Sequence, residues 1–184
     1  DTDRSRGLGD VYKRQVTGRM IAGDEALPAE EAVNVFVNKM NEKAKEIGCK
    51  NTNFTCPDGF HNDNHYTTAM DLLRITLYSQ DYPEIAASGK KTYREVEFLS
   101  GEYIYWNNSN KLIQPDSDDY YTYATGLKTG MTDYSGHCVV ATAERFGHEL
   151  IIVCLGSESA AIRWNDTRAL FDAGFAYIRD SDNG

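Results

Sequence analysis

The sequence predicts an α+β domain in which an antiparallel sheet is flanked by helices. Two helical patterns come first, a small hairpin pattern follows, and the last third holds a pair of apolar strands and a closing helix. Helices and strands that are grouped in this way, without strict alternation, are typical of antiparallel α+β architectures. The 184 residues suffice for one domain, or a large part of one, with a sizeable core.

The first helix is predicted from about Pro28 to Ile47. Acidic residues stand in its first turn and lysines in its last two turns, where both suit the helix dipole. Gly48 then supplies the left-handed residue that commonly ends a helix. The expected apolar face, with its three- and four-residue steps, consists of Ala32, Phe36, Met40, Ala44 and Ile47.

A second helix is predicted after Thr68, because Thr68 and Asp71 have the spacing of a capping box. It should end before Pro83, since the residue before a proline disfavours helical geometry, and a short helical turn is expected at 83–87. The side chains expected to face the core are Leu72, Ile75 and either Tyr78 or Ser79.

Residues 92–98 alternate like a strand, and 103–106 are their expected hairpin partner across Ser100-Gly101. Two buried strands follow at 138–143 and 150–155, joined by a tight turn. The closing helix is predicted from about 160 to 178. Its expected core face consists of Trp164, Leu170, Phe171 and Phe175.

The composition excludes several classes of function. A net charge of −9 and no basic stripe argue against a nucleic-acid partner. The apolar run 149–155 is far too short to cross a bilayer. The four cysteines contain no Cys-x-x-Cys and the four histidines are scattered, so neither a metal nor another cofactor is expected. Cys49 and Cys56 could pair in an oxidising compartment, or all four thiols could be small reduced side chains.

Residues 1–19 are predicted to be a non-native or disordered leader. Residues 1–15 are rich in charge and glycine, lack apolar periodicity, and look like translated linker sequence; the alternative is a disordered native tail. The partial catalytic domain is expected at 20–178, followed by a tail at 179–184.

Lys128-Thr129-Gly130 is the motif that carries chemistry. A tripeptide alone is a weak signal, but this one precedes a turn and the apolar strand pair, which favours a sheet edge facing a cleft. In penicillin-recognising serine acyl-transferases, Ser-x-x-Lys, Ser-x-Asn and Lys-Thr-Gly converge. The lysine supplies a positive charge, the threonine hydroxyl can bond a substrate carboxylate, and the glycine lets a substrate backbone lie against the strand.

Several further blocks, in the right order, resemble serine-type D-alanyl-D-alanine carboxypeptidases, the low-molecular-weight penicillin-binding proteins. The resemblance covers roughly Ile21 to Ile178 and corresponds to the C-terminal part of their catalytic domain. The blocks are 36–48, 50–54, 58–61, 65–71 and 125–133.

This resemblance implies a β-lactamase/transpeptidase-like fold, incomplete here. It also implies a parent enzyme that trims the terminal D-Ala from peptidoglycan stem pentapeptides through an acyl-enzyme. Such an enzyme acts outside the cytoplasm, at the bacterial cell envelope, in peptidoglycan biosynthesis and cell shape. The complete enzyme would bind β-lactam antibiotics, and any membrane association would come through segments outside this sequence.

The resemblance also assigns site residues. Lys128 is the catalytic candidate and binds substrate together with Thr129 and Gly130, while Thr132 is a weaker candidate. Arg163 falls where the family often has a basic residue near the substrate carboxylate; a surface arginine on a helix is an equal alternative.

The nucleophile is not found in this sequence. Ser88-Gly89-Lys90-Lys91 is the only formal Ser-x-x-Lys, and we interpret it as accidental. It is expected in a loop after the first helix, whereas the family's motif precedes that helix. Residues 22–26 have the spacing of the Ser-x-Asn motif, with Ala and Asp where Ser and Asn would stand. The other interpretation is that this motif is missing. The chain itself is therefore expected to be inactive. Two alternatives remain open: a non-catalytic module that binds wall peptides, and a β-lactamase-like hydrolase.

Overall fold

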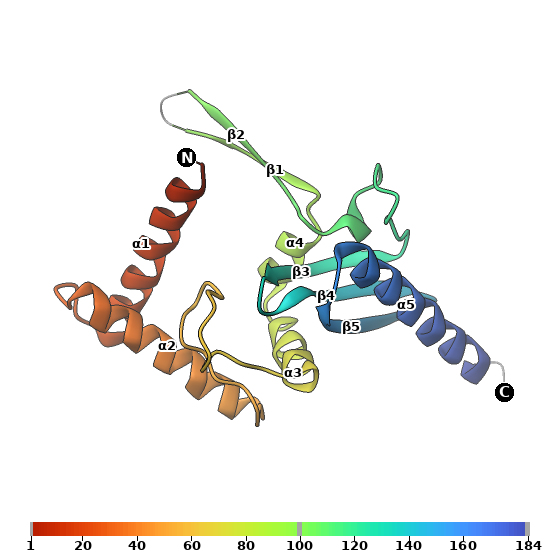
Figure 1. Cartoon of the computed structure of the whole chain (residues 1–184), viewed down its shortest axis with the longest axis horizontal. Helices are drawn as coiled ribbons and strands as arrows, with labels where there is room; N and C mark the ends of the chain where they lie inside the picture. Colours follow the sequence, from red (N-terminus) through yellow and green to blue (C-terminus); the bar gives the residue numbers. More distant parts are fainter. Residues whose placement is uncertain (1, 99–100, 183–184) are drawn as a thin grey trace. The chain divides into compact units, whose positions relative to one another are not determined.

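The computed structural model describes residues 2–98 and 101–182, with side chains from residue 12 onward (Figure 1). The chain divides into two compact units, Asp1–Ile75 and Thr76–Gly184. The first unit is helical, and the second contains both sheets and the closing helix. The predicted turn residue Ser100 lies outside the described residues.

The first unit begins with helix α1, Thr2–Ala22, which includes most of the segment 1–19 predicted as a non-native or disordered leader. The structure gives this segment a helical backbone, and its non-native origin stays a prediction. At Gly18, helix α1 lies close against helix α2, Ala29–Glu46, because a Cβ added there would lie 1.7 Å from the Ala32 carbonyl oxygen. Because glycine has no side chain, a helix contact at this position adds no apolar residue to the sequence pattern.

Helix α2 ends where the sequence predicts. Gly48 has φ +88°. Its N–H donates to the carbonyl of Lys45, and the N–H of Cys49 donates to the carbonyl of Ala44. These two bonds form a Schellman motif, which satisfies the last carbonyls of the helix. On the apolar face, Ala32 and Ala44 are buried as expected. The third buried position is Val37, whereas Phe36, Met40 and Ile47 are half-buried.

Helix α3, Ala69–Ser79, begins in the first unit and ends in the second. The Thr68 hydroxyl accepts from the N–H of Asp71, which confirms the predicted cap. The Asp71 carboxylate, however, does not reach back to Thr68. It is 1% exposed and accepts from the N–H of Asn51 at 2.7 Å and the hydroxyl of Thr52 at 2.9 Å. It thereby ties the segment after α2 to α3. The predicted apolar face of α3 is half-buried.

The stability contribution of Asp71 should depend on pH. Burial alone raises its pKa, but the hydrogen bonds from Asn51, Thr52 and Lys50, with Arg74, outweigh this and hold the pKa below its usual value. A carboxyl group whose pKa is lower in the folded state stabilises the fold at pH values above its unfolded pKa, about 3.9. This contribution is lost as the pH falls through the pKa of the folded state.

Asp71→Asn should therefore lower the unfolding midpoint at neutral pH, and the difference from the parent chain should shrink as the solution is acidified. Thermal melts at a series of pH values check this. Asp63→Asn is the control, since the Asp63 side chain is 98% exposed. A difference that is the same at every pH would contradict the role assigned to the Asp71 charge.

The second unit holds two antiparallel sheets, a two-stranded β1-β2 and a three-stranded β3-β4-β5. This confirms the predicted α+β class and both hairpins. The elements are α4 (Pro83–Gly89), β1 (Tyr93–Glu97), β2 (Tyr103–Asn107), the 3-10 helix η1 (Lys111–Ile113), β3 (Ala124–Thr132), β4 (Gly136–Arg145), β5 (His148–Ser157) and α5 (Ala160–Asp182).

Helix α5 lies across one face of β3-β4-β5 (Figure 1), and the core forms between them. Leu170 does not take part: it is 48% exposed, so its predicted core position is wrong. Thr167 is buried in its place, since the steps from Trp164 through Thr167 to Phe171 follow the helical repeat. The core cluster consists of Leu112, Tyr121, Val139, Ala141, Ala143, Trp164, Phe171 and Phe175.

All four cysteines are free thiols, so the possible Cys49–Cys56 pair is not formed. Cys49 Sγ donates to the Asp71 carbonyl, and Cys56 Sγ donates to the Phe60 carbonyl. Among the described helices, none combines the length and the apolar character that crossing a bilayer requires.

Candidate functional site

The triplet Lys128-Thr129-Gly130 lies in β3, one of the two outer strands of the three-stranded sheet, and the sequence predicts such an edge position. On one side it pairs with β4, where Thr129 stands opposite Val139 and Gly130 opposite Cys138. Among the described residues no strand pairs with its other side. Because side chains alternate along a strand, Lys128 and Thr129 leave opposite faces. A ligand lying along this edge can therefore be contacted from both faces.

Lys128 is an exposed cation without a counter-charge. Its ammonium donates to the Thr129 carbonyl, and no ion pair among the described residues includes it. Desolvation lowers its pKa from the usual lysine value, even though the side chain as a whole is exposed. An unpaired, partly desolvated ammonium is suited to attract a carboxylate.

Thr129 is 9% exposed, and its hydroxyl lies 2.5 Å from the hydroxyl of Ser109. Ser109 comes from the loop between β2 and η1. No sequence motif marks Ser109, because its only local signal is a run of turn-forming residues, 107–110. The pairing joins positions twenty residues apart, which no periodic pattern can reveal.

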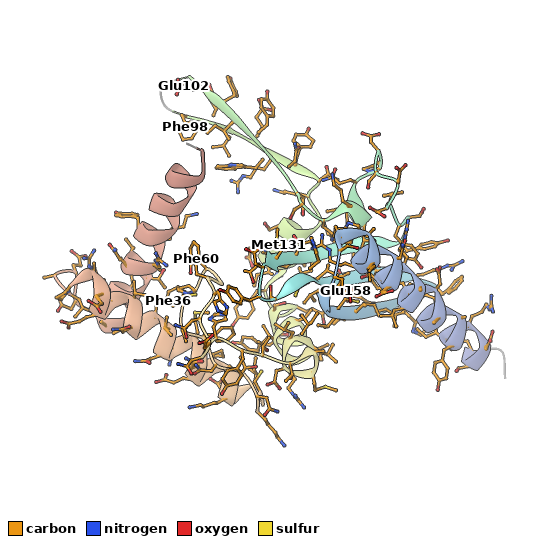
Figure 2. The ribbon with its side chains drawn as sticks, viewed as in Figure 1. Phe36, Phe60, Phe98, Glu102, Met131 and Glu158 are labelled. Carbon is orange, nitrogen blue, oxygen red and sulfur yellow. The ribbon has the colours of Figure 1, made fainter. Side chains whose placement is uncertain are left out.

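Gly130 is not required by the packing of the protein itself. A Cβ built at this position meets no atom within 4 Å, and the residue does not have a left-handed φ. The space in front of Gly130 is therefore open. Met131 follows it, with its side chain 60% exposed near the end of β3 (Figure 2).

Arg163 is not a surface arginine, so that alternative is wrong. It is 7% exposed, its Nη1 donates to the carbonyl of Cys138 at 3.1 Å, and it lies within 3.5 Å of the Gly130 carbonyl. Its guanidinium stacks on the Trp164 ring at 3.9 Å, an attraction that offsets part of the cost of burial. Its Nε is buried with no partner among the described residues. The structure thus places Arg163, from helix α5, against the backbone of the triplet.

Thr132 lies at the end of β3, and its hydroxyl is used by the turn into β4. It donates to Ser135 Oγ at 2.8 Å and accepts from the N–H of Ser135 at 2.9 Å. No described hydrogen bond connects it with Thr129 or Arg163. Its role in substrate binding stays a prediction.

Ser88 lies in the last turn of α4, not in the loop that the sequence predicts. It lines a hollow of about 520 Å³ with Lys91, Trp106 and Asn108, but no described hydrogen bond joins its hydroxyl to the Lys91 ammonium. Our interpretation of this Ser-x-x-Lys as accidental stays a prediction. The other doubtful segment, residues 22–26, forms the turn between α1 and α2.

The antiparallel sheet covered by a helix, with Lys-Thr-Gly on one outer strand, matches the class of DD-transpeptidase and β-lactamase-like folds. The family model described as D-alanyl-D-alanine carboxypeptidase matches residues 28–159. The chain belongs to this family of serine peptidases, and the matches correspond to the C-terminal part of the catalytic domain.

Two curated relatives are D-alanyl-D-alanine carboxypeptidases. DacF of Bacillus subtilis is 31% identical over 142 residues, covering 77% of this chain and 35% of the relative. DacC of Escherichia coli is 31% identical over 144 residues, covering 78% and 34%. The chain thus spans about a third of the length of these relatives.

Two solved structures show the same fold. A DD-transpeptidase from Streptomyces has 28% identity and a TM-score of 0.75, with 83% of this chain and 58% of that one covered. A penicillin-binding protein from Listeria monocytogenes, in its cefotaxime-bound form, has 28% identity and a TM-score of 0.65, with 88% and 65% covered.

Proposed function

We propose that this chain is the part of a serine-type D-Ala-D-Ala carboxypeptidase that binds the substrate carboxylate. The whole enzyme would trim the terminal D-Ala from peptidoglycan stem pentapeptides, outside the cytoplasm, and would bind β-lactam antibiotics. The observation that carries the proposal is the unpaired edge of β3, where the exposed Lys128 and the buried hydroxyl of Thr129 precede an unfilled space at Gly130.

Each group has a distinct task in this proposal. The peptide backbone pairs with the free edge of β3 as an added strand. Lys128 attracts the terminal carboxylate, and the Thr129 hydroxyl donates a hydrogen bond to it. Arg163 donates hydrogen bonds to the carbonyls of Gly130 and Cys138, which holds the strand backbone in place and adds positive charge near it.

A titration of the isotope-labelled chain with N-acetyl-D-alanyl-D-alanine tests the proposal. We expect saturable amide shifts along β3, and much weaker ones with the L,L stereoisomer. Equal shifts with both stereoisomers, or shifts confined to other elements, would refute the proposed site.

Gly130→Val separates binding from folding. Because a Cβ at this position meets no protein atom, the unfolding free energy should change by less than about 0.5 kcal/mol. The side chain would instead fill the space that the ligand backbone needs, so binding of the D,D dipeptide should be lost. Parallel melts and titrations check this. A destabilised variant with unchanged affinity would contradict the assignment.

A non-catalytic module that binds wall peptides is the second candidate. Such a module would use the same unpaired edge of β3 without an acylation step. Recovery of the upstream coding sequence separates the two. A Ser-x-x-Lys followed by Ser-x-Asn would indicate the enzyme.

Labelled penicillin should form no covalent adduct with the 184-residue chain, because acylation requires a serine activated by a neighbouring base. Gel fluorography checks this, with a complete D-Ala-D-Ala carboxypeptidase as the positive control. An adduct that maps to Ser88 would overturn our interpretation of that motif.

A further inference from the structure

Ser109 contacts the one hydroxyl of the triplet. Its Oγ lies 2.5 Å from Thr129 Oγ1, and either atom can be the donor. Thr129 is buried, whereas Ser109 itself is exposed. The pair therefore joins a buried strand position to a loop that forms no part of the sheet.

The loop that carries Ser109 is held by the residues on either side of it. Asn108 Nδ2 donates to the carbonyls of Lys91 at 3.0 Å and Gly89 at 3.3 Å. Asn110 is fully buried, and its Oδ1 accepts from the N–H of Leu112 at 3.1 Å. With both neighbours fixed in this way, the position of the Ser109 backbone does not depend on its own hydroxyl.

The direction of the Ser109–Thr129 hydrogen bond decides what Thr129 can do. A hydroxyl has one proton to donate and can accept up to two hydrogen bonds. If Thr129 donates to Ser109, no proton is left for a ligand. If Ser109 donates, the Thr129 proton is free, and an arriving carboxylate, which can only accept, selects this arrangement.

We infer that Ser109 is a positioning residue, which donates to Thr129 so that the Thr129 hydroxyl is aimed at the ligand carboxylate. This inference rests on the proposed function, because it concerns how the same site recognises its ligand. Hydrogen bonds to a charged acceptor are stronger than those to a neutral one. The benefit from Ser109 should therefore be larger for a carboxylate than for an amide.

The test compares N-acetyl-D-alanyl-D-alanine with its C-terminal amide on three forms of the full chain: the parent, Ser109→Ala and Ser109→Thr. We expect Ser109→Ala to weaken binding of the acid by up to about tenfold, the upper range for one hydrogen bond between neutral groups, and to change binding of the amide little. Ser109→Thr keeps a hydroxyl and should restore most of the preference for the acid.

Thr125→Val is the matched control. It removes a hydroxyl from another pair on β3, the Thr125–Thr142 hydrogen bond of 2.8 Å, and should leave the preference for the acid unchanged. Amide spectra of every variant establish that the chain remains folded.

Equal losses for acid and amide in Ser109→Ala, or no loss at all, would overturn the inference while the proposed function stands. A failure of Ser109→Thr to restore the preference would likewise refute a role for the hydroxyl. If the parent chain already binds acid and amide equally, carboxylate recognition at this site is wrong, and the proposed function fails together with the inference.

Discussion

Replacement of Phe171 by alanine should cost about 3–5 kcal/mol of unfolding free energy, the usual range for a buried aromatic side chain. Phe171 is fully buried in α5 and stacks on Tyr121 and Phe175, with ring centroids 5.3 Å and 6.3 Å away. The total free energy of unfolding of a small domain is about 5–15 kcal/mol. The substitution should therefore remove much of the stability of the unit that carries β3.

Urea unfolding followed by tryptophan fluorescence measures this, because Trp164 lies in the same core. Tyr177→Ala is the control on the same helix. Tyr177 is 76% exposed, so its loss should change the unfolding free energy by less than about 0.5 kcal/mol. Similar midpoints for both variants would show that α5 does not hold the sheet as described.

Lys128→Met should weaken binding of N-acetyl-D-alanyl-D-alanine by at least about tenfold, since a hydrogen bond to a charged group contributes about 1.5–3 kcal/mol. Folding should not suffer. Lys128 makes no described ion pair, and its lowered pKa means that the folded state disfavours its charge. A matched variant, Lys111→Met, removes an exposed lysine from η1 and should leave the affinity unchanged.

The pH dependence of binding gives a second measurement of the Lys128 charge. Because desolvation lowers its pKa, Lys128 loses its proton at a lower pH than an ordinary lysine, about 10.4. Affinity for the acid should therefore decline as the pH rises, beginning below that value, and Lys128→Met should abolish the decline. An affinity that is flat with pH in the parent chain would contradict a role for the ammonium.

Local signals predicted much of this fold correctly. Gly48 ends α2 because a left-handed residue is needed there. Alternation in 92–98 predicted the first hairpin, and the apolar strands 138–143 and 150–155 with their tight turn predicted the second. The position of the triplet on an outer strand also followed from its neighbours in sequence. Each of these features depends on residues within a few positions of one another.

Features that depend on distant residues could not be predicted in this way. Asp71 has the spacing of a capping box, yet its carboxylate bonds a segment about twenty residues earlier in the chain. In the sequence, Arg163 is equally compatible with a surface position, because the carbonyls of Cys138 and Gly130 that it contacts lie 25 and 33 residues earlier in the chain. Ser109 contacts Thr129 only because its loop lies beside β3, twenty residues away in the chain.

The unpaired edge of β3 also affects how the chain behaves at high concentration. A free strand edge does not distinguish a short peptide from the edge of another copy, because both offer the same backbone donors and acceptors. The groups proposed to hold the stem peptide are thus also those through which copies could aggregate. A bound dipeptide would compete with that association, so adding the ligand should slow the aggregation of concentrated solutions.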